Sequence, residues 1–236
     1  MGARRCGVAD AAGNVSLCRS MRSETMLGMQ ISLALYPGFT ALDIVGPFQT
    51  FADVPGLEVG FVAEHAGPVL DHTGRLSMVA TASFAEVTAP EIIVIPGGMV
   101  RPQGVDDPVV QWIRAVHPIT TWTTSVCTGS LFLATAGVLD GVDATGHWAA
   151  MEELGQLGAC PTGSRVVERG KVITAAGVSA GIDMGLTLVA RIFGDDMAKI
   201  IQLAIEYDPQ PPFDAGSPEK STPEIIDLLR ATMALR

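Results

Sequence analysis

One cysteine stands at a point where a strand is predicted to run directly into a helix. In Thr124-Ser-Val-Cys127-Thr-Gly-Ser130 an apolar run ends in a sharp turn, and Cys127 is the nucleophile candidate just before the helix. This order of strand, nucleophile and helix is typical of a nucleophile elbow. The positive end of the helix dipole favours the thiolate at such a position. The alternative is a buried structural cysteine, which is common in protein cores.

A second candidate element is the glycine pair in Pro96-Gly97-Gly98, which follows a buried apolar run. Glycines at the end of a strand allow backbone N–H groups to approach a ligand closely. Together with the N–H of Thr128, those of Gly97 and Gly98 would form an oxyanion hole and bind substrate. The alternative is an ordinary turn that ends a strand.

Three further polar residues stand in apolar surroundings. Asp43 is either a helix N-cap or a carboxyl group held near the site, where burial would raise its pKa and suit a general acid. His147 is a possible partner of Cys127, but a His beside a Trp is as often simply packed. Asp183 interrupts an apolar helix and is interpreted as a buried structural acid that bonds backbone or hydroxyl groups.

Patterns for metal or cofactor binding are absent from the sequence. It contains no His-x-x-x-His pair, no carboxylate cluster and no C-x-x-C pair. Its glycines form neither a phosphate loop nor a dinucleotide fingerprint. We therefore expect a site without metal or cofactor that acts on a small-molecule substrate.

The elements that must position these residues alternate between strand and helix patterns. Strands are predicted at residues 30–36, 57–63, 91–95 and 119–125, with shorter ones at 78–80, 143–145, 166–167 and 172–174. Helices are predicted at residues 43–54, 107–116, 131–139, 149–157, 182–193, 197–207 and from a capping box at 221–224 to about 235. This alternation predicts a doubly wound, mostly parallel sheet with helices on both faces, a flavodoxin-like α/β fold. In such folds the site lies at the carboxyl ends of the strands.

Composition narrows the class of protein. The chain has 236 residues, of which 48% are hydrophobic, and we expect one domain over residues 29–236 after a disordered extension at 1–28. Its formal net charge of −10 argues against partners such as nucleic acid or an anionic membrane. The longest charge-free stretch, residues 115–139, is rich in Ser and Thr and predicts no membrane span. Scattered cysteines and the absence of a signal-peptide pattern favour the cytoplasm.

Four motifs together resemble the ThiJ/PfpI superfamily. They are Leu42-Asp43-Ile-Val-Gly-Pro47, Ile95-Pro-Gly-Gly98, Thr124-Ser-Val-Cys-Thr-Gly129 and Ala180-Gly-Ile-Asp183. The resemblance covers nearly all of residues 29–236 and implies a class I glutamine-amidotransferase-like fold and a homodimer. It also implies that Cys127 is the nucleophile, Thr128 its active-site neighbour and Asp43 the acid near the thiol.

Within the superfamily the late segments Gln202-Leu-Ala-Ile-Glu-Tyr207 and Pro211-Pro-Phe-Asp-Ala-Gly-Ser-Pro218 resemble the branch of isonitrile hydratases. That resemblance implies a cysteine-dependent lyase that converts isonitriles to N-substituted formamides through a covalent thioimidate. Peptidase-like members place a His where this chain has Thr128, and deglycase-like members usually carry a Glu where Asp43 stands. A deglycase or glyoxalase-type activity on 2-oxoaldehydes and a non-enzymatic redox or stress sensor remain the alternatives. Regulators of the AraC type add a helix-turn-helix module, and the chain is expected to lack one.

Overall fold

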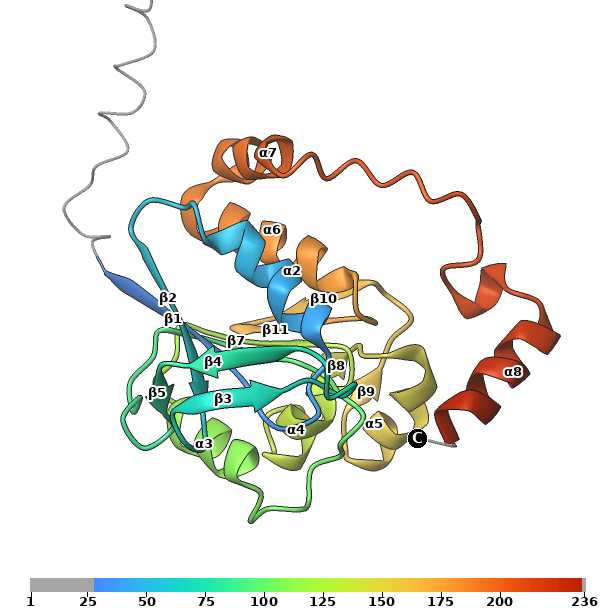
Figure 1. Ribbon diagram of the computed structural model, residues 1–236, viewed down its shortest axis with the longest axis horizontal. Coiled ribbons are helices and arrows are strands. Elements are labelled where there is room, and N and C mark those ends of the chain that lie inside the picture. The colour runs from blue at the N-terminus through green and yellow to red at the C-terminus, as the bar shows by residue number, and fades with distance from the viewer. Residues whose placement is uncertain (1–27, 235–236) are drawn as a thin grey trace, which may run out of the picture.

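A seven-stranded sheet forms the centre of the part of the protein that the structure describes (Figure 1). The structure is a computed structural model, and it describes residues 28–234. The strands lie in the order β10-β11-β7-β6-β1-β2-β5, and every pairing is parallel except that of β10 with β11. Their bounds are β1 Met29–Ala34, β2 Leu57–Ala63, β5 Ala82–Ser83, β6 Ile92–Ile95, β7 Trp122–Val126, β10 Val166–Arg169 and β11 Val172–Ala175.

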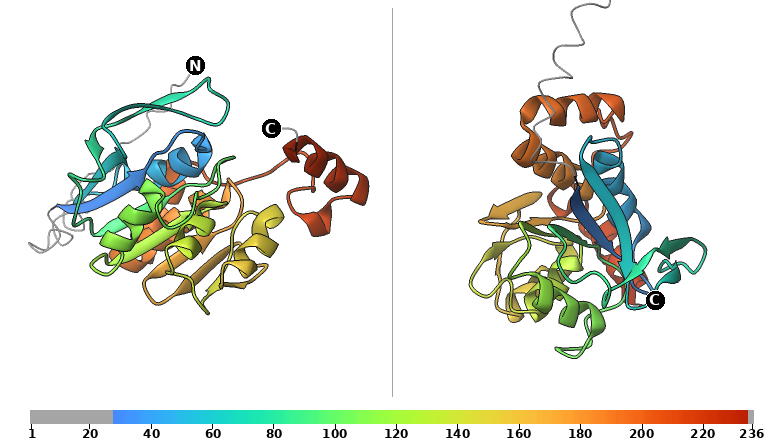
Figure 2. Two further views of the ribbon diagram at one scale, coloured as in Figure 1. Left: turned by 90° about the horizontal axis from the view of Figure 1, so that it is seen from below. Right: turned by 90° about the vertical axis from the view of Figure 1, so that its left-hand side faces the viewer.

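Helices cover both faces of this sheet. On one face α2 (Ala41–Phe51) packs on α6 (Ala180–Phe193), which in turn contacts α7 (Asp195–Ala204). The other face carries α3 (Pro108–Val116), α4 (Gly129–Thr135) and α5 (Met151–Gln156), as Figures 1 and 2 show. The predicted doubly wound, flavodoxin-like α/β fold is therefore confirmed.

The central strands are buried on both sides, which explains their continuous apolar sequence. Every residue of β6 is buried, and Ile31 and Leu33 of β1 are fully buried beside it. In the sheet β1 lies between β2, the next strand in the sequence, and β6, which comes later in the chain. At such a switch point the connections after neighbouring strands diverge and leave a crevice at the carboxyl ends. Asp43, Gly97 and Cys127 follow β1, β6 and β7 and so belong to this end of the sheet.

Smaller elements surround the sheet. A hairpin joins β3 (Gly67–Leu70) to β4 (Ser77–Ala80), and β8 (Asp143–Ala144) pairs with β9 (Cys160–Pro161). A 3-10 turn, η1 (Trp148–Ala150), precedes α5, and another, η2 (Pro218–Lys220), precedes α8 (Pro223–Ala234).

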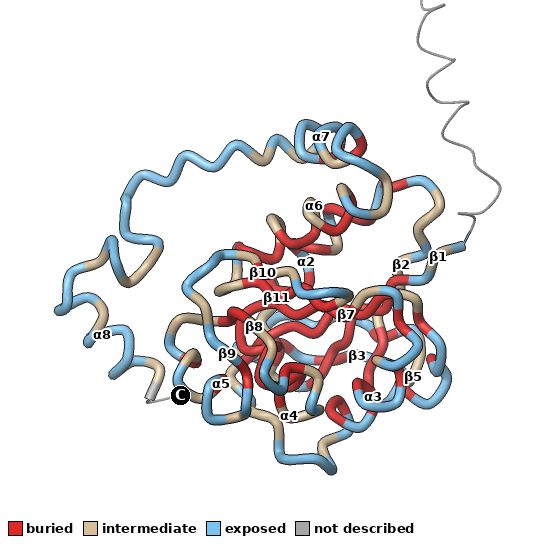
Figure 3. The backbone as a smooth tube through the Cα atoms, turned by 180° about the vertical axis from the view of Figure 1, so that it is seen from behind, coloured by how far each residue is buried: buried red, intermediate tan, exposed pale blue. Residues whose placement is uncertain are grey.

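Residues 205–234 form a C-terminal arm that leaves the body of the protein after α7 and ends in α8. Figure 3 shows the body largely buried along its strands, whereas the arm is exposed over most of its length. Phe213 in the arm is 78% exposed. The arm comes back to the body at α8, where Arg230 lies over the ring of Trp148 in η1.

Several predicted boundaries need correction. The helix expected at 43–54 is α2 at 41–51, and the strand expected at 119–125 begins only at Trp122. The helix expected from 131 begins at Gly129, directly after the elbow. Apart from Gly28, the extension expected at 1–28 lies outside the described residues, as does the end of the last helix. Within residues 28–234 the structure has no helix of the length and apolarity needed to cross a membrane.

Candidate active site

The backbone bends sharply at Cys127, between β7 and α4. Its φ of 59° lies in the left-handed region, which a residue with a side chain adopts at a cost. Bonds from the Cys127 N–H to the carbonyls of Ala175 (3.0 Å), the last residue of β11, and Ala176 (3.1 Å) hold this conformation. The predicted order of strand, cysteine and helix is confirmed, and its strained backbone is the signature of a nucleophile elbow.

Thr128 fastens the elbow to the end of β6. Its Oγ1 accepts the N–H of Gly98 at 2.9 Å and donates to the carbonyl of Gly98 at 3.0 Å. Thr128 is buried, so water does not compete for either bond. The side chain expected beside the nucleophile therefore fixes the distance between two strand ends.

Asp43 lies in the first turn of α2, where Thr40 and not Asp43 occupies the N-cap position. The Asp43 side chain is fully buried, and its Oδ2 accepts the Gly97 N–H at 2.8 Å. Its other oxygen, Oδ1, has no hydrogen-bond partner by distance and angle among the described residues. The carboxyl is thus held against the end of β6 with one oxygen left available.

Burial decides the protonation of Asp43. Loss of solvent raises the pKa of its carboxyl from 3.8 to about 7, although the Gly97 N–H and the neighbouring Cys127 thiol both act to lower it. A carboxyl group with a pKa near neutrality can both accept and donate a proton at physiological pH. Asp43 thus has the protonation behaviour that the sequence analysis asked of a general acid.

The thiol of Cys127 behaves differently from the expectation. Burial and, to a smaller extent, the negative charge of Asp43 raise its pKa from 9.0 to about 12, although the N–H groups of Val178 and Thr128 act to lower it. Only 5% of Cys127 is exposed. The expected thiolate at the helix N-terminus is therefore wrong for the free protein, because desolvation outweighs the attraction of a short helix.

The expected oxyanion hole also needs correction. The N–H of Gly97 is bonded to Asp43 and that of Gly98 to Thr128, so neither is free to bind a substrate. The two N–H groups that stabilise negative charge on the sulfur are those of Thr128 and Val178. Val178, a β-branched residue with a φ of 25°, was not among the site residues predicted from the sequence. No local signal marks it, since Val178 reaches Cys127 only through the fold.

Cys127 opens into a pocket of about 490 Å³ at this end of the sheet. Its wall combines residues after three strands with residues from η1 and α8. The lining residues are Gly98, Met99, Arg101, Cys127, Thr128, His147, Ala149, Val178, Arg230 and Met233. Arg230 and Met233 belong to the C-terminal arm, and the sequence analysis identified neither.

His147 lies in this pocket, but it has a structural partner of its own. It caps η1, with its Nδ1 accepting the N–H of Ala149 at 3.3 Å. Burial and the nearby Arg101 both lower the pKa of its ring, which favours the neutral form. The structure thus brings His147 and Cys127 to one cavity, and a catalytic role for His147 stays a prediction.

Asp183 lies on α6, outside the pocket lining. It accepts bonds from Arg165 Nε at 2.9 Å and from the Tyr207 hydroxyl at 3.0 Å. The expected hydroxyl partner is present, but the side chain is 32% exposed and Arg165 neutralises it. The interpretation as a buried acid is wrong, and Asp183 instead fastens α6 to the start of the C-terminal arm.

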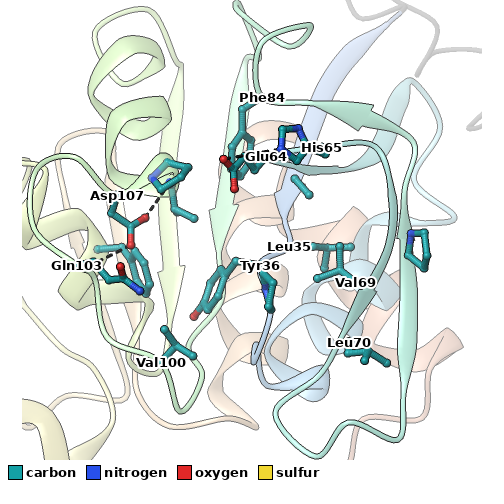
Figure 4. Close-up of a pocket in the computed structure, with 16 residues that line it drawn as sticks. Leu35, Tyr36, Glu64, His65, Val69, Leu70, Phe84, Val100, Gln103 and Asp107 are labelled. Carbon is teal, nitrogen blue, oxygen red and sulfur yellow. Dashed lines mark hydrogen bonds and ion pairs between the residues drawn. The ribbon is translucent and has the colours of Figure 1, made fainter.

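A larger cavity, of about 750 Å³, lies between the ends of β1 and β2, the hairpin and α3 (Figure 4). Leu35, Val69 and Phe84 give it an apolar wall, and Tyr36 stands beside them with its hydroxyl donating to the Pro96 carbonyl. Cys127 is not among its lining residues. Over residues 28–234 no group of three or more His, Cys, Asp or Glu side chains is placed to hold a metal ion.

Known proteins resemble the chain over its whole described length. The sequence model of the DJ-1/PfpI family matches residues 29–191. Isonitrile hydratase of Pseudomonas putida is 39% identical over 209 residues, which are 88% of this chain and 91% of that enzyme. The transcriptional regulator CdhR of Pseudomonas aeruginosa, of the HTH type, is 28% identical over 70% of this chain and 51% of its own length.

Among solved structures, a ThiJ/PfpI family protein from Pseudomonas syringae superimposes with a TM-score of 0.84. It is 34% identical, and the match covers 97% of this chain and 93% of that one. The family match spans more than half of the chain and includes Asp43, Gly97 and Cys127. The chain belongs to the DJ-1/PfpI family.

Proposed function

We propose that this protein is an isonitrile hydratase-like lyase that converts an isonitrile and water to an N-substituted formamide. The observation that carries the proposal is the pairing of Asp43, with a pKa of about 7, with the Cys127 thiol at the base of a pocket. The 39% identity to isonitrile hydratase over nearly the full length of both chains supports the choice of substrate class.

The first step would join the sulfur to the terminal carbon of the isonitrile. As the sulfur–carbon bond forms, the thiol proton passes to the Asp43 carboxylate and from there to the same carbon. The product is a thioimidate, in which the former isonitrile carbon carries one hydrogen, the sulfur and a double bond to nitrogen. A covalent intermediate of this kind divides one difficult addition into two easier steps. The N–H groups of Val178 and Thr128 stabilise negative charge on the sulfur as the proton leaves.

The second step would release the formamide. Water adds to the thioimidate carbon, and one of its protons passes through Asp43 to the nitrogen. The sulfur–carbon bond then breaks, the remaining hydroxyl proton passes through Asp43 to the sulfur, and the carbonyl of the formamide forms. Asp43 acts alternately as base and acid, which requires a pKa close to the working pH. No other reactant than water is consumed.

The raised pKa of Cys127 argues against the rival role of a redox sensor. Sulfur oxidation proceeds through the thiolate, and burial raises the pKa of this thiol to about 12. The second rival is a deglycase or glyoxalase-type enzyme. Turnover of methylglyoxal without hydration of an isonitrile would favour it over the proposed hydratase.

The test is formamide production from a simple alkyl isonitrile by the wild type, Cys127→Ala and Asp43→Asn. We expect no turnover by Cys127→Ala, and for Asp43→Asn a decrease of about 100-fold, the usual scale for a positioned acid. Melting curves at pH 5 should be similar for wild type and Asp43→Asn, because the amide can still accept the Gly97 N–H. A wild type that hydrates no isonitrile but consumes methylglyoxal would overturn the proposal in favour of the rival enzyme.

A further inference from the structure

The pocket above Cys127 has an unusual charge for this protein. The chain as a whole carries a formal net charge of −10. The two charged side chains among the lining residues are nevertheless both arginines, Arg101 and Arg230. A positively charged wall in an acidic protein favours a ligand with the opposite charge.

One of the two arginines is paired with a carboxylate at hydrogen-bond distance, and the other is not. Arg101 donates from its Nε to Glu153 Oε2 at 2.9 Å, and both side chains are 40% exposed. Arg230 has its nearest carboxylate, that of Asp227, at 3.9 Å, which is too far for a hydrogen bond. Across residues 28–234 the structure gives the guanidinium of Arg230 no hydrogen bond. Its planar donors therefore remain available to a ligand in the pocket.

Two features direct Arg230 toward the pocket. Its guanidinium lies over the ring of Trp148, 5.5 Å from the ring centroid, which is within the range of a cation–π contact. Along α8, Arg230 and Met233 also share one helical face, and both line the pocket. Leu228 lies on the side of the helix away from Arg230 and is 69% exposed. The helix thus presents one arginine and one methionine to the site.

We propose that the pocket takes isonitriles whose substituent carries a carboxylate, and that Arg230 binds this carboxylate while Cys127 attacks the isonitrile carbon. An arginine fork matches the two oxygens of a carboxylate in geometry as well as charge. Met99, Val178 and Met233 supply apolar contacts for the carbon chain between the two groups. The substrate class rests on the proposed function, but the anion subsite at Arg230 does not.

The subsite is tested first without any isonitrile. Cys127 is alkylated at pH 8.5 with iodoacetate, which is anionic, or with iodoacetamide, which is neutral and of nearly the same shape, and peptide masses report each rate. We expect the ratio of the iodoacetate rate to the iodoacetamide rate at Cys127 to fall about three- to fivefold in Arg230→Gln. Leu228→Gln, on the outer face of α8, should leave the ratio unchanged. The exposed Cys160 serves as an internal reference in every sample.

The substrate class is tested second, with isocyanoacetate and its neutral methyl ester. Wild type should show the higher kcat/KM for the carboxylate, and Arg230→Gln should remove most of that preference while Arg230→Lys restores part of it. An alkylation ratio that Arg230→Gln leaves unchanged overturns the inference, even if both isonitriles are hydrated. A ratio that falls while neither compound yields formamide upholds the anion subsite and overturns the proposed function.

Discussion

The two walls of the pocket are built in different ways. One wall comes from the turns after β6, β7 and β11, and Asp43 is buried against the first of these turns, where its Oδ2 accepts the Gly97 N–H. The other comes from α8, at the end of an arm whose side chains are mostly exposed (Figure 3). Gly97 shows how little freedom the first wall has, since a Cβ there would lie 2.5 Å from the Thr128 nitrogen. Such a distance leaves no room for any side chain.

This contrast separates the chemistry of the site from its selectivity. The wall that holds Asp43, Thr128 and Cys127 is part of the packed body, so its geometry is set by the same contacts that stabilise the fold. The wall that holds Arg230 and Met233 contributes little packing and can change without cost to the body. Changes that disturb the packing of the first wall should therefore alter rate and stability together, whereas changes in the second wall should act mainly on substrate preference.

The largest effect should appear in the pH dependence that Asp43 imposes. The proposed reaction needs the Asp43–Cys127 pair to hold one proton, with the carboxyl ionised and the thiol protonated. The pair reaches this state above the pKa of Asp43, about 7, and leaves it only above the pKa of Cys127, about 12. We expect kcat/KM to rise about tenfold per pH unit below 7 and to level off above it. Measurement of kcat/KM from pH 5 to 9 checks this, and a profile that falls over this range would contradict the assignment.

Stability should change in the opposite direction over part of this range. The folded pKa of Asp43 lies above its unfolded value, so between about pH 4 and 7 the unfolded chain binds fewer protons than the folded one. Raising the pH through this window therefore destabilises the wild type. Asp43→Asn cannot ionise, and its melting temperature should fall less than that of the wild type between pH 5 and 8.

A smaller effect is expected from the bonds of Thr128. Thr128→Val keeps the shape but leaves both the N–H and the carbonyl of Gly98 without their partner. A buried group left unpaired costs about 1–3 kcal/mol, which corresponds to a decrease of roughly 5 °C in melting temperature for a domain of this size. Thr128→Ser, which retains the hydroxyl, is the control and should lose less. Equal melting temperatures for the wild type, Thr128→Val and Thr128→Ser would show that the hydrogen bonds between Thr128 and Gly98 do not stabilise the fold.

The first wall was visible in the sequence and the second was not. Cys127, Gly97 and Asp43 lie in short apolar contexts at predicted strand ends, and the fold class alone brings such ends together. Val178 approaches the sulfur only because β11 and α6 meet beside β7. Arg230 lies in a helix that the capping box at 221–224 predicts, yet nothing near it in sequence indicates which surface that helix meets.

The protonation of Cys127 was likewise beyond the sequence. The helix dipole at Cys127 is a local feature that a motif reveals, and it predicts a thiolate. The desolvation that opposes it depends on everything packed around the sulfur, which leaves Cys127 5% exposed. The helix dipole lowers the pKa of the thiol and is evident from the motif, whereas the larger contribution, desolvation, raises the pKa and depends on the whole fold.

The smallest effect on stability should follow removal of the C-terminal arm. A chain ended after Asp208 keeps the bond between Tyr207 and Asp183 but loses α8, Arg230 and Met233. We expect its melting temperature to remain within about 2 °C of the full chain, because exposed segments contribute little to global stability. Its iodoacetamide rate at Cys127 should increase, since one wall of the pocket is gone, and its preference for iodoacetate should be lost. Melting curves and alkylation rates of the two chains measure these effects.

A fall in melting temperature of 10 °C or more would instead mean that the exposed apolar residues of the arm, Phe213 and Leu228 among them, are buried in the protein as it assembles. Light scattering on both chains would then separate the expected homodimer from a monomer of 24.6 kDa.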